Sequence, residues 1–154
     1  MRVSCVPMLV VLLAALSAQA SLPDTVRLEG DWSYQVSRQA VLALEGDSVR
    51  ARLPWSSPLG LAPVAACEGP DRGLVVVDAS RGGRLVHLSP TLRTVSIHAL
   101  PGTLRAADLA GARAWWFKGQ GLVLQTSRPP RRWLLGHLTQ APRELPLTDS
   151  GAVP

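Results

Sequence analysis

The sequence contains no asparagine, a single lysine (Lys118) and only two cysteines in 154 residues. Cys5 lies in the apolar N-terminal segment, so Cys67 alone remains once that segment is removed. A lone cysteine cannot form a disulfide within the chain, which excludes the disulfide-stapled class of small secreted domain. We therefore expect packing to hold the fold together, with Cys67 buried as a small apolar residue in the run PVAAC.

Sequence motifs of catalysis and long apolar runs are also missing. The chain has no Gly-x-Ser-x-Gly nucleophile turn, no metalloprotease helix motif and no phosphate-binding glycine loop. We expect no cofactor, and an enzyme is the less favoured class. No segment after the N-terminal one approaches the roughly 20 apolar residues that cross a bilayer. The formal charge of +5 is scattered without a basic-aromatic stripe, so nucleic acid is not an expected partner.

Residues 1–20 have the layout of a cleavable secretory signal peptide. Arg2 precedes an apolar core at Met8–Leu16, and Ala18 and Ala20 supply the small residues of a cleavage site. The many Ala, Arg, Leu and Pro residues, against one Lys and no Asn, suggest a GC-rich bacterial genome. We therefore expect a periplasmic or secreted protein.

Short apolar runs separated by Gly, Pro, Asp and Ser fill residues 21–140 and predict an all-β domain. The predicted strands are Val26–Leu28, Trp32–Val36, Val41–Leu44, Val49–Leu53, Leu59–Ala66, Leu74–Val77, Arg84–Leu88, Thr94–Leu100, Leu104–Leu109, Ala114–Phe117, Leu122–Gln125 and Arg132–Leu138. A helix over Thr103–Ala114 is the one serious competitor, because its alanines favour a helix although Gly111 does not. Residues 141–154 are assigned to a C-terminal tail.

Three segments share one plan: strand, polar turn, an arginine near the end of that turn, strand. They are Ala40–Trp55, Arg84–Leu100 and Leu122–Leu138. Ala51 corresponds to Val95 and Val95 to Trp133, at offsets of 44 and 38 residues. A period near 40 with four short strands is typical of a propeller blade. The repeat units are predicted at about 25–55, 58–100 and 103–138.

Three blades fall short of the roughly four to eight in a closed propeller. We favour propeller-like blades that form an incomplete propeller, and a small β-sandwich or barrel is the alternative. The missing blades would come from self-association of the chain, or the chain is a fragment of a larger propeller protein.

The segment Pro58–Pro90 resembles a blade of the NHL or YVTN type. The matching features are Pro58-x-Gly60-Leu61-Ala62, the turn around Asp71-Arg72-Gly73, and the run VVVD that ends at Asp78. The resemblance implies a β-propeller repeat. Propeller hydrolases of the lactonase type, which this architecture also resembles, hold a metal with Glu, Asn and Asp, and the lack of asparagine argues against that activity here.

The histidines are the only candidate metal ligands. His87 and His98 fall on paired strands and are expected to face each other, but a metal site needs a third ligand that the sequence does not place. Polar residues on a solvated sheet face are therefore the favoured interpretation. His137, near a strand end, is expected to be exposed.

Two other groups of residues could serve binding or packing. Arg128, Arg131, Arg132 and Trp133 form a basic cluster whose prolines mark a loop. A solvated turn is the favoured interpretation of its arginines, a surface that contacts an acidic partner is the alternative, and Trp133 is favoured as a core residue. Trp115-Trp116-Phe117 must point to both faces of one strand, which suits an inner strand between two blades or an aromatic platform for a sugar or peptide. Asp78 is expected to brace the turn it enters rather than to act in catalysis.

These patterns together predict an exported, non-catalytic β-repeat protein that presents a binding or scaffolding surface. The expected partner is a protein or a carbohydrate, with self-association as a further expectation. A lactonase-type hydrolase and a fragment of a larger propeller are the alternatives.

Overall fold

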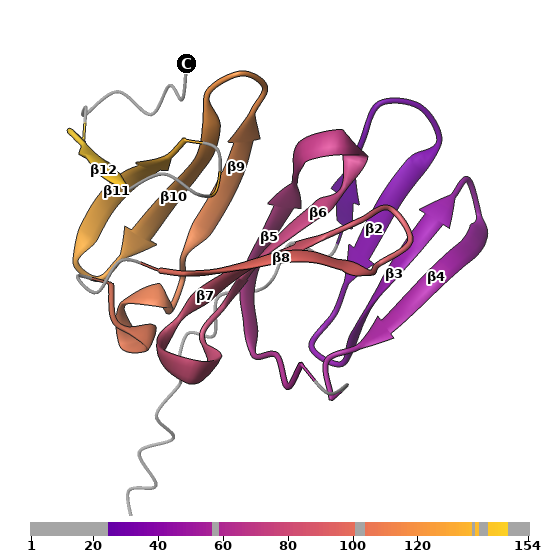
Figure 1. Cartoon of the computed structure of the whole chain (residues 1–154), viewed down its shortest axis with the longest axis horizontal. Coiled ribbons are helices and arrows are strands. Elements are labelled where there is room, and N and C mark those ends of the chain that lie inside the picture. The colour runs from indigo at the N-terminus through magenta and orange to yellow at the C-terminus, as the bar shows by residue number, and fades with distance from the viewer. Residues whose placement is uncertain (1–24, 57–58, 101–103, 137, 139–141, 148–154) are drawn as a thin grey trace, which may run out of the picture.

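The computed structural model describes residues 25–56, 59–100, 104–136, 138 and 142–147. Within these residues the chain is all-β, with three antiparallel sheets of four strands each (Figure 1). Each sheet takes its strands in chain order, so every neighbouring pair is a hairpin or short connection. The predicted all-β fold with three four-stranded propeller-like blades is confirmed. The predicted signal peptide lies outside the described residues.

We name the sheets A, B and C. Sheet A holds β1 (Thr25–Arg27), β2 (Trp32–Val36), β3 (Ala40–Glu45) and β4 (Ser48–Pro54). Sheet B holds β5 (Pro63–Glu68), β6 (Leu74–Asp78), β7 (Arg84–Leu88) and β8 (Thr94–Ala99). Sheet C holds β9 (Arg113–Phe117), β10 (Gly121–Ser127), β11 (Pro130–Leu135) and β12 (Arg143–Leu145). In the described part of the chain, three short 3₁₀ helices connect strands: η1 (Pro70–Arg72), η2 (Ser80–Gly82) and η3 (Ala106–Leu109).

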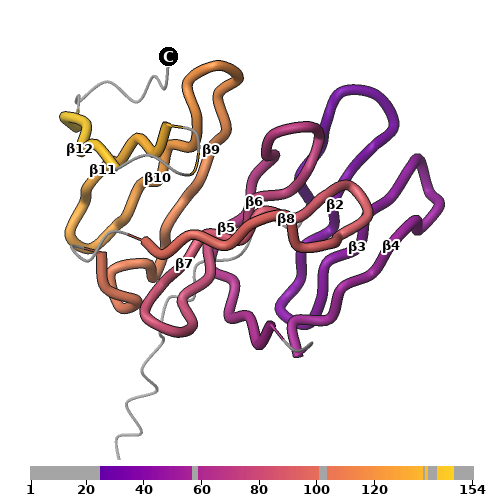
Figure 2. Tube along the Cα trace, viewed as in Figure 1, coloured from indigo at the N-terminus to yellow at the C-terminus, as the bar shows by residue number. Residues whose placement is uncertain are grey.

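Sheet B lies between the other two sheets (Figure 2). Its first strand, β5, contacts β1 of sheet A and β9 of sheet C. Every residue of β6 and β7 is buried, because both faces of these central strands are covered. Alternate side chains therefore serve two separate cores, as expected for a sheet packed on both sides.

No helix of the described residues is long and apolar enough to span a membrane.

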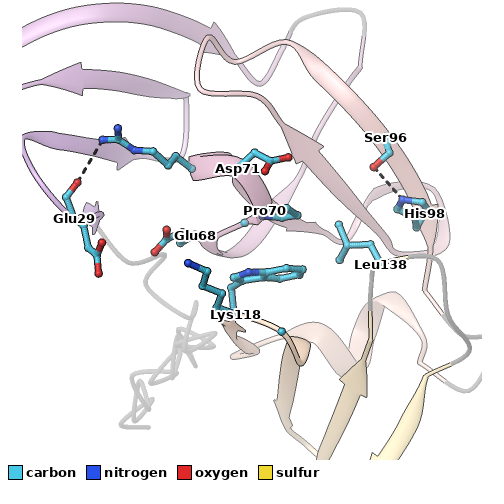
Figure 3. Close-up of a pocket in the computed structure, with 12 residues that line it drawn as sticks. Glu29, Glu68, Pro70, Asp71, Ser96, His98, Lys118 and Leu138 are labelled. Carbon is cyan, nitrogen blue, oxygen red and sulfur yellow. Dashed lines mark hydrogen bonds between the residues drawn. The ribbon is translucent and has the colours of Figure 1, made fainter.

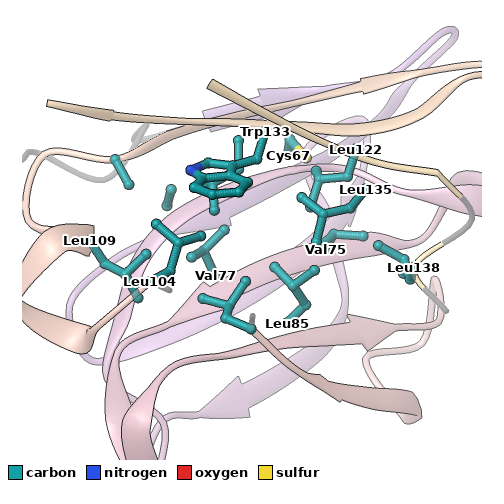
Figure 4. Close-up of a cluster of buried hydrophobic side chains, with 14 residues drawn as sticks. Cys67, Val75, Val77, Leu85, Leu104, Leu109, Leu122, Trp133, Leu135 and Leu138 are labelled. Atoms are coloured by element: carbon teal, nitrogen blue, oxygen red, sulfur yellow. The ribbon is translucent and has the colours of Figure 1, made fainter. Parts of the chain in front are cut away.

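Two apolar cores join the three sheets. Tyr34, Val41 and Ala43 of sheet A meet Val76 and Val86 of sheet B in the first core. The second core lies between sheets B and C, where large side chains of sheet C cover small ones of sheet B (Figure 4). Its main members are Cys67, Val75, Val77, Leu85, Leu122, Leu124, Trp133 and Leu135. Cys67 is buried, as expected.

The third repeat unit differs from the prediction in phase. The segments Ala40–Trp55 and Arg84–Leu100 form the third and fourth strands of their sheets, but Leu122–Leu138 supplies β10 and β11, the second and third strands of sheet C. The predicted match of Val95 to Trp133 is therefore wrong: Val95 is 58% exposed on an outer strand, whereas Trp133 is 6% exposed in the core.

The boundaries of the third unit shift for the same reason. The predicted strand Leu104–Leu109 is wrong, because residues 106–109 form η3, where Leu109 is buried against the second core. The unit gains its fourth strand, β12, from within residues 141–154, the predicted C-terminal tail. β12 pairs with β11, so sheet C reaches four strands without the segment before Ala110.

Candidate functional site

A hollow of about 770 Å³ lies where residues of all three sheets converge (Figure 3). The β1–β2 turn contributes from sheet A, the β5–β6 connection and β8 from sheet B, and β9 with its following turn from sheet C. The lining residues are Glu29, Glu68, Gly69, Pro70, Asp71, Arg72, Ser96, His98, Trp116, Lys118, Gly119 and Leu138. The volume is within the range that small-molecule sites occupy.

The 3₁₀ turn η1 forms one wall of the hollow and is held by sheet A. The Tyr34 hydroxyl donates a hydrogen bond of 2.5 Å to the carbonyl oxygen of Arg72, and the Arg72 side chain donates one of 3.3 Å to the carbonyl oxygen of Glu29. Asp71 and Arg72 have φ of 52° and 60°, in the left-handed region that few non-glycine residues adopt. Tyr34, which is fully buried, therefore fixes the shape of this wall across the A–B boundary.

The glycines around η1 allow the turn to pass closely over the sheet. A Cβ on Gly73 would lie 2.7 Å from His87 Nε2 and would also collide with the carbonyl oxygen of Leu88. His87 is only 7% exposed beneath this turn. Burial lowers its pKa, although the Pro70 carbonyl and the Asp71 carboxylate act in the opposite direction. The expectation of a solvated His87 is wrong, because η1 covers the imidazole.

The two predicted metal candidates do not face each other directly. His87 pairs with Ser96 and His98 with Leu85, so the two imidazoles lie on one face in a diagonal relation. The His98 ring is 2.9 Å from the Ser96 hydroxyl and lines the hollow. In the described parts of the chain no three His, Cys, Asp or Glu side chains are placed to hold a metal ion. His137 lies outside the described residues.

Strand β9 brings an aromatic ring and a cation to the hollow. Trp116 packs partly against the second core, and both Trp116 and Lys118 line the hollow. Trp115 and Phe117 point to the opposite face of the strand because side chains alternate. All three rings are half-buried. β9 is the strand of sheet C that contacts β5, but only its Trp116 face packs against sheet B, so the predicted position between two blades is not reached within the described residues. The run of three aromatic residues was the sequence signal that pointed to this strand.

Asp78 braces its turn through Ser80, as predicted, and also bonds to Ala62 and Arg84. Its Oδ1 accepts hydrogen bonds from the Ala62 amide at 2.6 Å and the Ser80 amide at 3.0 Å. Its Oδ2 accepts from the Ser80 hydroxyl at 2.6 Å and from Arg84 Nε at 2.5 Å. Arg84 in turn donates to the Leu59 carbonyl oxygen at 2.7 Å, so one buried pair ties the chain before β5 to the η2 turn.

The pKa of Asp78 reflects this network. Burial acts to raise the pKa of this carboxyl, but the hydrogen bonds from Ser80, Arg84 and Ala62 outweigh burial and hold the pKa below its ordinary value. Asp78 is therefore a structural anion at neutral pH. Since it does not line the hollow, it belongs to the fold of sheet B rather than to the candidate site.

The predicted basic surface does not form a single patch. Arg128 is exposed in the β10–β11 turn, whereas Trp133 packs in the second core. Arg131 lines a small cavity of about 220 Å³, and its Nε lies 3.9 Å from Glu144 Oε1. Arg132 points to the opposite face of β11 and donates a hydrogen bond to Gln125 Oε1. The cluster Arg128, Arg131, Arg132 and Trp133 is dispersed because alternate residues of a strand face opposite sides.

Comparison with known proteins adds no family to this description, since no protein-family model and no curated protein matches the sequence. The resemblance of Pro58–Pro90 to an NHL or YVTN blade remains a prediction. The candidate site therefore rests on the geometry of the hollow.

Proposed function

We propose that this chain is an exported, non-catalytic β-repeat protein that binds a short carbohydrate in the hollow. The observation that carries the proposal is the half-buried indole of Trp116 inside a cavity to which all three sheets contribute. A pocket with an aromatic surface and a few polar groups is the usual form of a small-molecule site. The ring face supplies apolar contact at little cost in side-chain entropy.

The charges around the hollow favour a neutral ligand rich in hydroxyl groups. Three carboxylates, those of Glu29, Glu68 and Asp71, line the same space as two cations, Arg72 and Lys118. A ligand of one charge would meet like charges somewhere on this wall, at an energetic cost. A hydroxyl both donates and accepts, so a sugar satisfies carboxylates and cations alike.

The decisive experiment is a tryptophan-fluorescence titration of the exported chain with malto-, cello- and chito-oligosaccharides. We expect one of these series to bind with saturation, and the Trp116→Ala variant to lose that binding. Trp115→Ala is the matched control, because it removes the same ring from the opposite face of β9 and is expected to bind normally. Failure of every oligosaccharide to bind, or equal binding by the Trp116→Ala variant, would overturn the proposal.

The rival function is metal-dependent hydrolysis of the lactonase type. The propeller-like arrangement of the three sheets resembles the architecture of that enzyme family. Metal analysis of the purified chain separates the two functions. A stoichiometric calcium or zinc ion together with lactone turnover would replace the binding function by the enzymatic one. A chain that is only a fragment of a larger propeller would fail to unfold cooperatively on heating, whereas we expect a single cooperative transition.

A further inference from the structure

Sheets A and C each present one face that no other sheet of the described chain covers. The A outer face consists of Thr25, Arg27, Ser33, Gln35, Leu42, Leu44, Val49 and Arg52, which pair across β1 to β4. The C outer face consists of Arg113, Trp115, Phe117, Val123, Gln125, Arg132, Leu134, Arg143 and Leu145, which pair across β9 to β12. Both faces mix apolar and polar side chains.

We propose that a second copy of the chain covers these faces. The C outer face of each copy packs on the A outer face of the other, which closes a two-fold ring of six four-stranded sheets. Six is within the range of about four to eight blades in closed propellers. The contact is head to tail within a closed two-copy ring, so it leaves no free end on which further copies could add. The proposal goes beyond ligand binding in the hollow and does not depend on it.

The first support is continuity with the contacts inside the chain. Sheet A stacks on sheet B and sheet B on sheet C, each time through alternate side chains of the facing strands. The first strands β1, β5 and β9 are neighbours along this stack. Stacking C on A of a second copy repeats the same contact with the same order of strands. Repeat units of this kind bury their faces only against neighbours.

The second support is the shape of the two faces. The A outer face contains a hollow of about 700 Å³, lined among others by Thr25, Gln35, Leu42 and Val49. The first strand of the C outer face carries the large rings of Trp115 and Phe117. Large side chains of sheet C already cover small ones at the B–C contact, where Trp133 packs in one core with Cys67, Val75 and Val77. The rings of β9 are therefore suited to the hollow of sheet A.

The third support is the exposure that a single copy leaves. Val49 is 57% exposed on the A outer face, and the two rings of the C outer face are only half-buried. Covering apolar surface of this kind drives association. Two aromatic anchors placed opposite a hollow form the arrangement in which interface energy concentrates.

Sedimentation equilibrium of the exported chain tests the proposal. We expect a dimer, and we expect Trp115→Glu and Val49→Glu each to raise the dissociation constant by at least about 30-fold, the loss typical of an interface anchor. Val95→Glu is the matched control, since Val95 is as exposed as Val49 but belongs to sheet B, and its variant is expected to remain a dimer. Circular dichroism of each variant reports whether the sheets still form.

Mixing the two variants gives a result that misfolding cannot imitate. Each variant alone carries one substitution in both of its A–C contacts, whereas a mixed dimer of Trp115→Glu and Val49→Glu chains keeps one contact intact and places both substitutions in the other. Because one buried Glu is expected to disrupt a contact by itself, the second adds little there, and the mixture is expected to associate more tightly than either variant alone. A monomeric wild-type chain would overturn the proposal. So would a dimer that only one of the two substitutions weakens, which would indicate pairing of like faces, or one that Val95→Glu weakens equally.

Discussion

At the scale of single residues, the Asp78 carboxylate accepts four hydrogen bonds and forms a buried ion pair with Arg84. The carboxylate at a strand end predicted a local brace, and the bonds to the Ser80 amide and hydroxyl confirm that prediction. The partners Ala62 and Arg84 carry no local signal. They come within reach only after β5, β6 and β7 pair, so the sequence alone could not identify the buried ion pair.

Replacing Asp78 by asparagine should destabilise the fold by about 3–5 kcal/mol, because Arg84 would remain buried without its counter-charge. Urea unfolding of the two proteins measures this difference. Glu45→Gln is the control: it breaks the exposed pair with Arg50 and should cost only about 0.2–1 kcal/mol.

The sign of the pH dependence follows from the lowered pKa. The stability that Asp78 contributes is complete above its unfolded value of 3.8 and is lost as the pH falls through the lower folded-state pKa. Since asparagine does not titrate, the two stabilities should converge over that acidic window. A difference that grows on acidification would contradict the role of an ionised Asp78.

At the scale of strands, the position within a sheet decides how much a side chain contributes. The central strands β6 and β7 are buried at every position, whereas β8 at the edge of the same sheet exposes Val95 and Ile97. The apolar pattern predicted all of these strands, but it did not predict which of them lie in the centre of the sheet and which lie at its edge. Apolar periodicity indicates that a segment faces a core. It does not indicate which strands flank that segment in the sheet.

The same limit explains the error in the third unit. The hairpin Leu122–Leu138 has the pattern of the other two hairpins, yet it occupies the middle of sheet C. Because η3 occupies the predicted first strand and β12 adds a strand at the other end, the hairpin lies one strand earlier in sheet C than its counterparts in sheets A and B. Three residues of strand are too few to carry a periodic signal of their own.

Substitutions at two positions of sheet B test this ranking. Leu85→Ala in β7 should destabilise the protein by about 2–5 kcal/mol, because it opens a cavity in the second core. Val95→Ala in β8 should change the stability by less than about 0.5 kcal/mol, as expected for an exposed position. Thermal unfolding of both variants measures the contrast, and equal losses would show that β8 is covered in solution.

At the scale of the whole molecule, three sheets make the hollow, and two of their faces are covered by no other sheet of the described residues. The sequence predicted the number of units and the aromatic strand, but not the convergence of distant turns on Trp116. That convergence depends on how sheets stack, which no single segment encodes. Stacking also determines the outer faces, so the proposed ligand site and the proposed dimer contact both depend on the same geometry.

Charge on the two outer faces gives a prediction for the dimer as a whole. The paired positions of the A outer face include Arg27 and Arg52, those of the C outer face include Arg132, and neither set contains a carboxylate. Docking therefore brings like charges together against the apolar contact. Raising NaCl from about 0.1 M to about 1 M shortens the screening length from about 10 to about 3 Å. The repulsion between the arginines should weaken, so the dissociation constant of the dimer should fall.

Sedimentation equilibrium across this salt range measures the effect, and Arg52→Gln should reduce the salt dependence by removing one of the repelling charges. Salt also strengthens apolar contacts, so the reduced slope in this variant, rather than the tighter binding alone, identifies the repulsion between arginines. A dimer that weakens as salt rises would mean that opposite charges meet at the contact. It would then have to use surfaces other than the A and C outer faces, because the paired residues of those faces supply only positive charge.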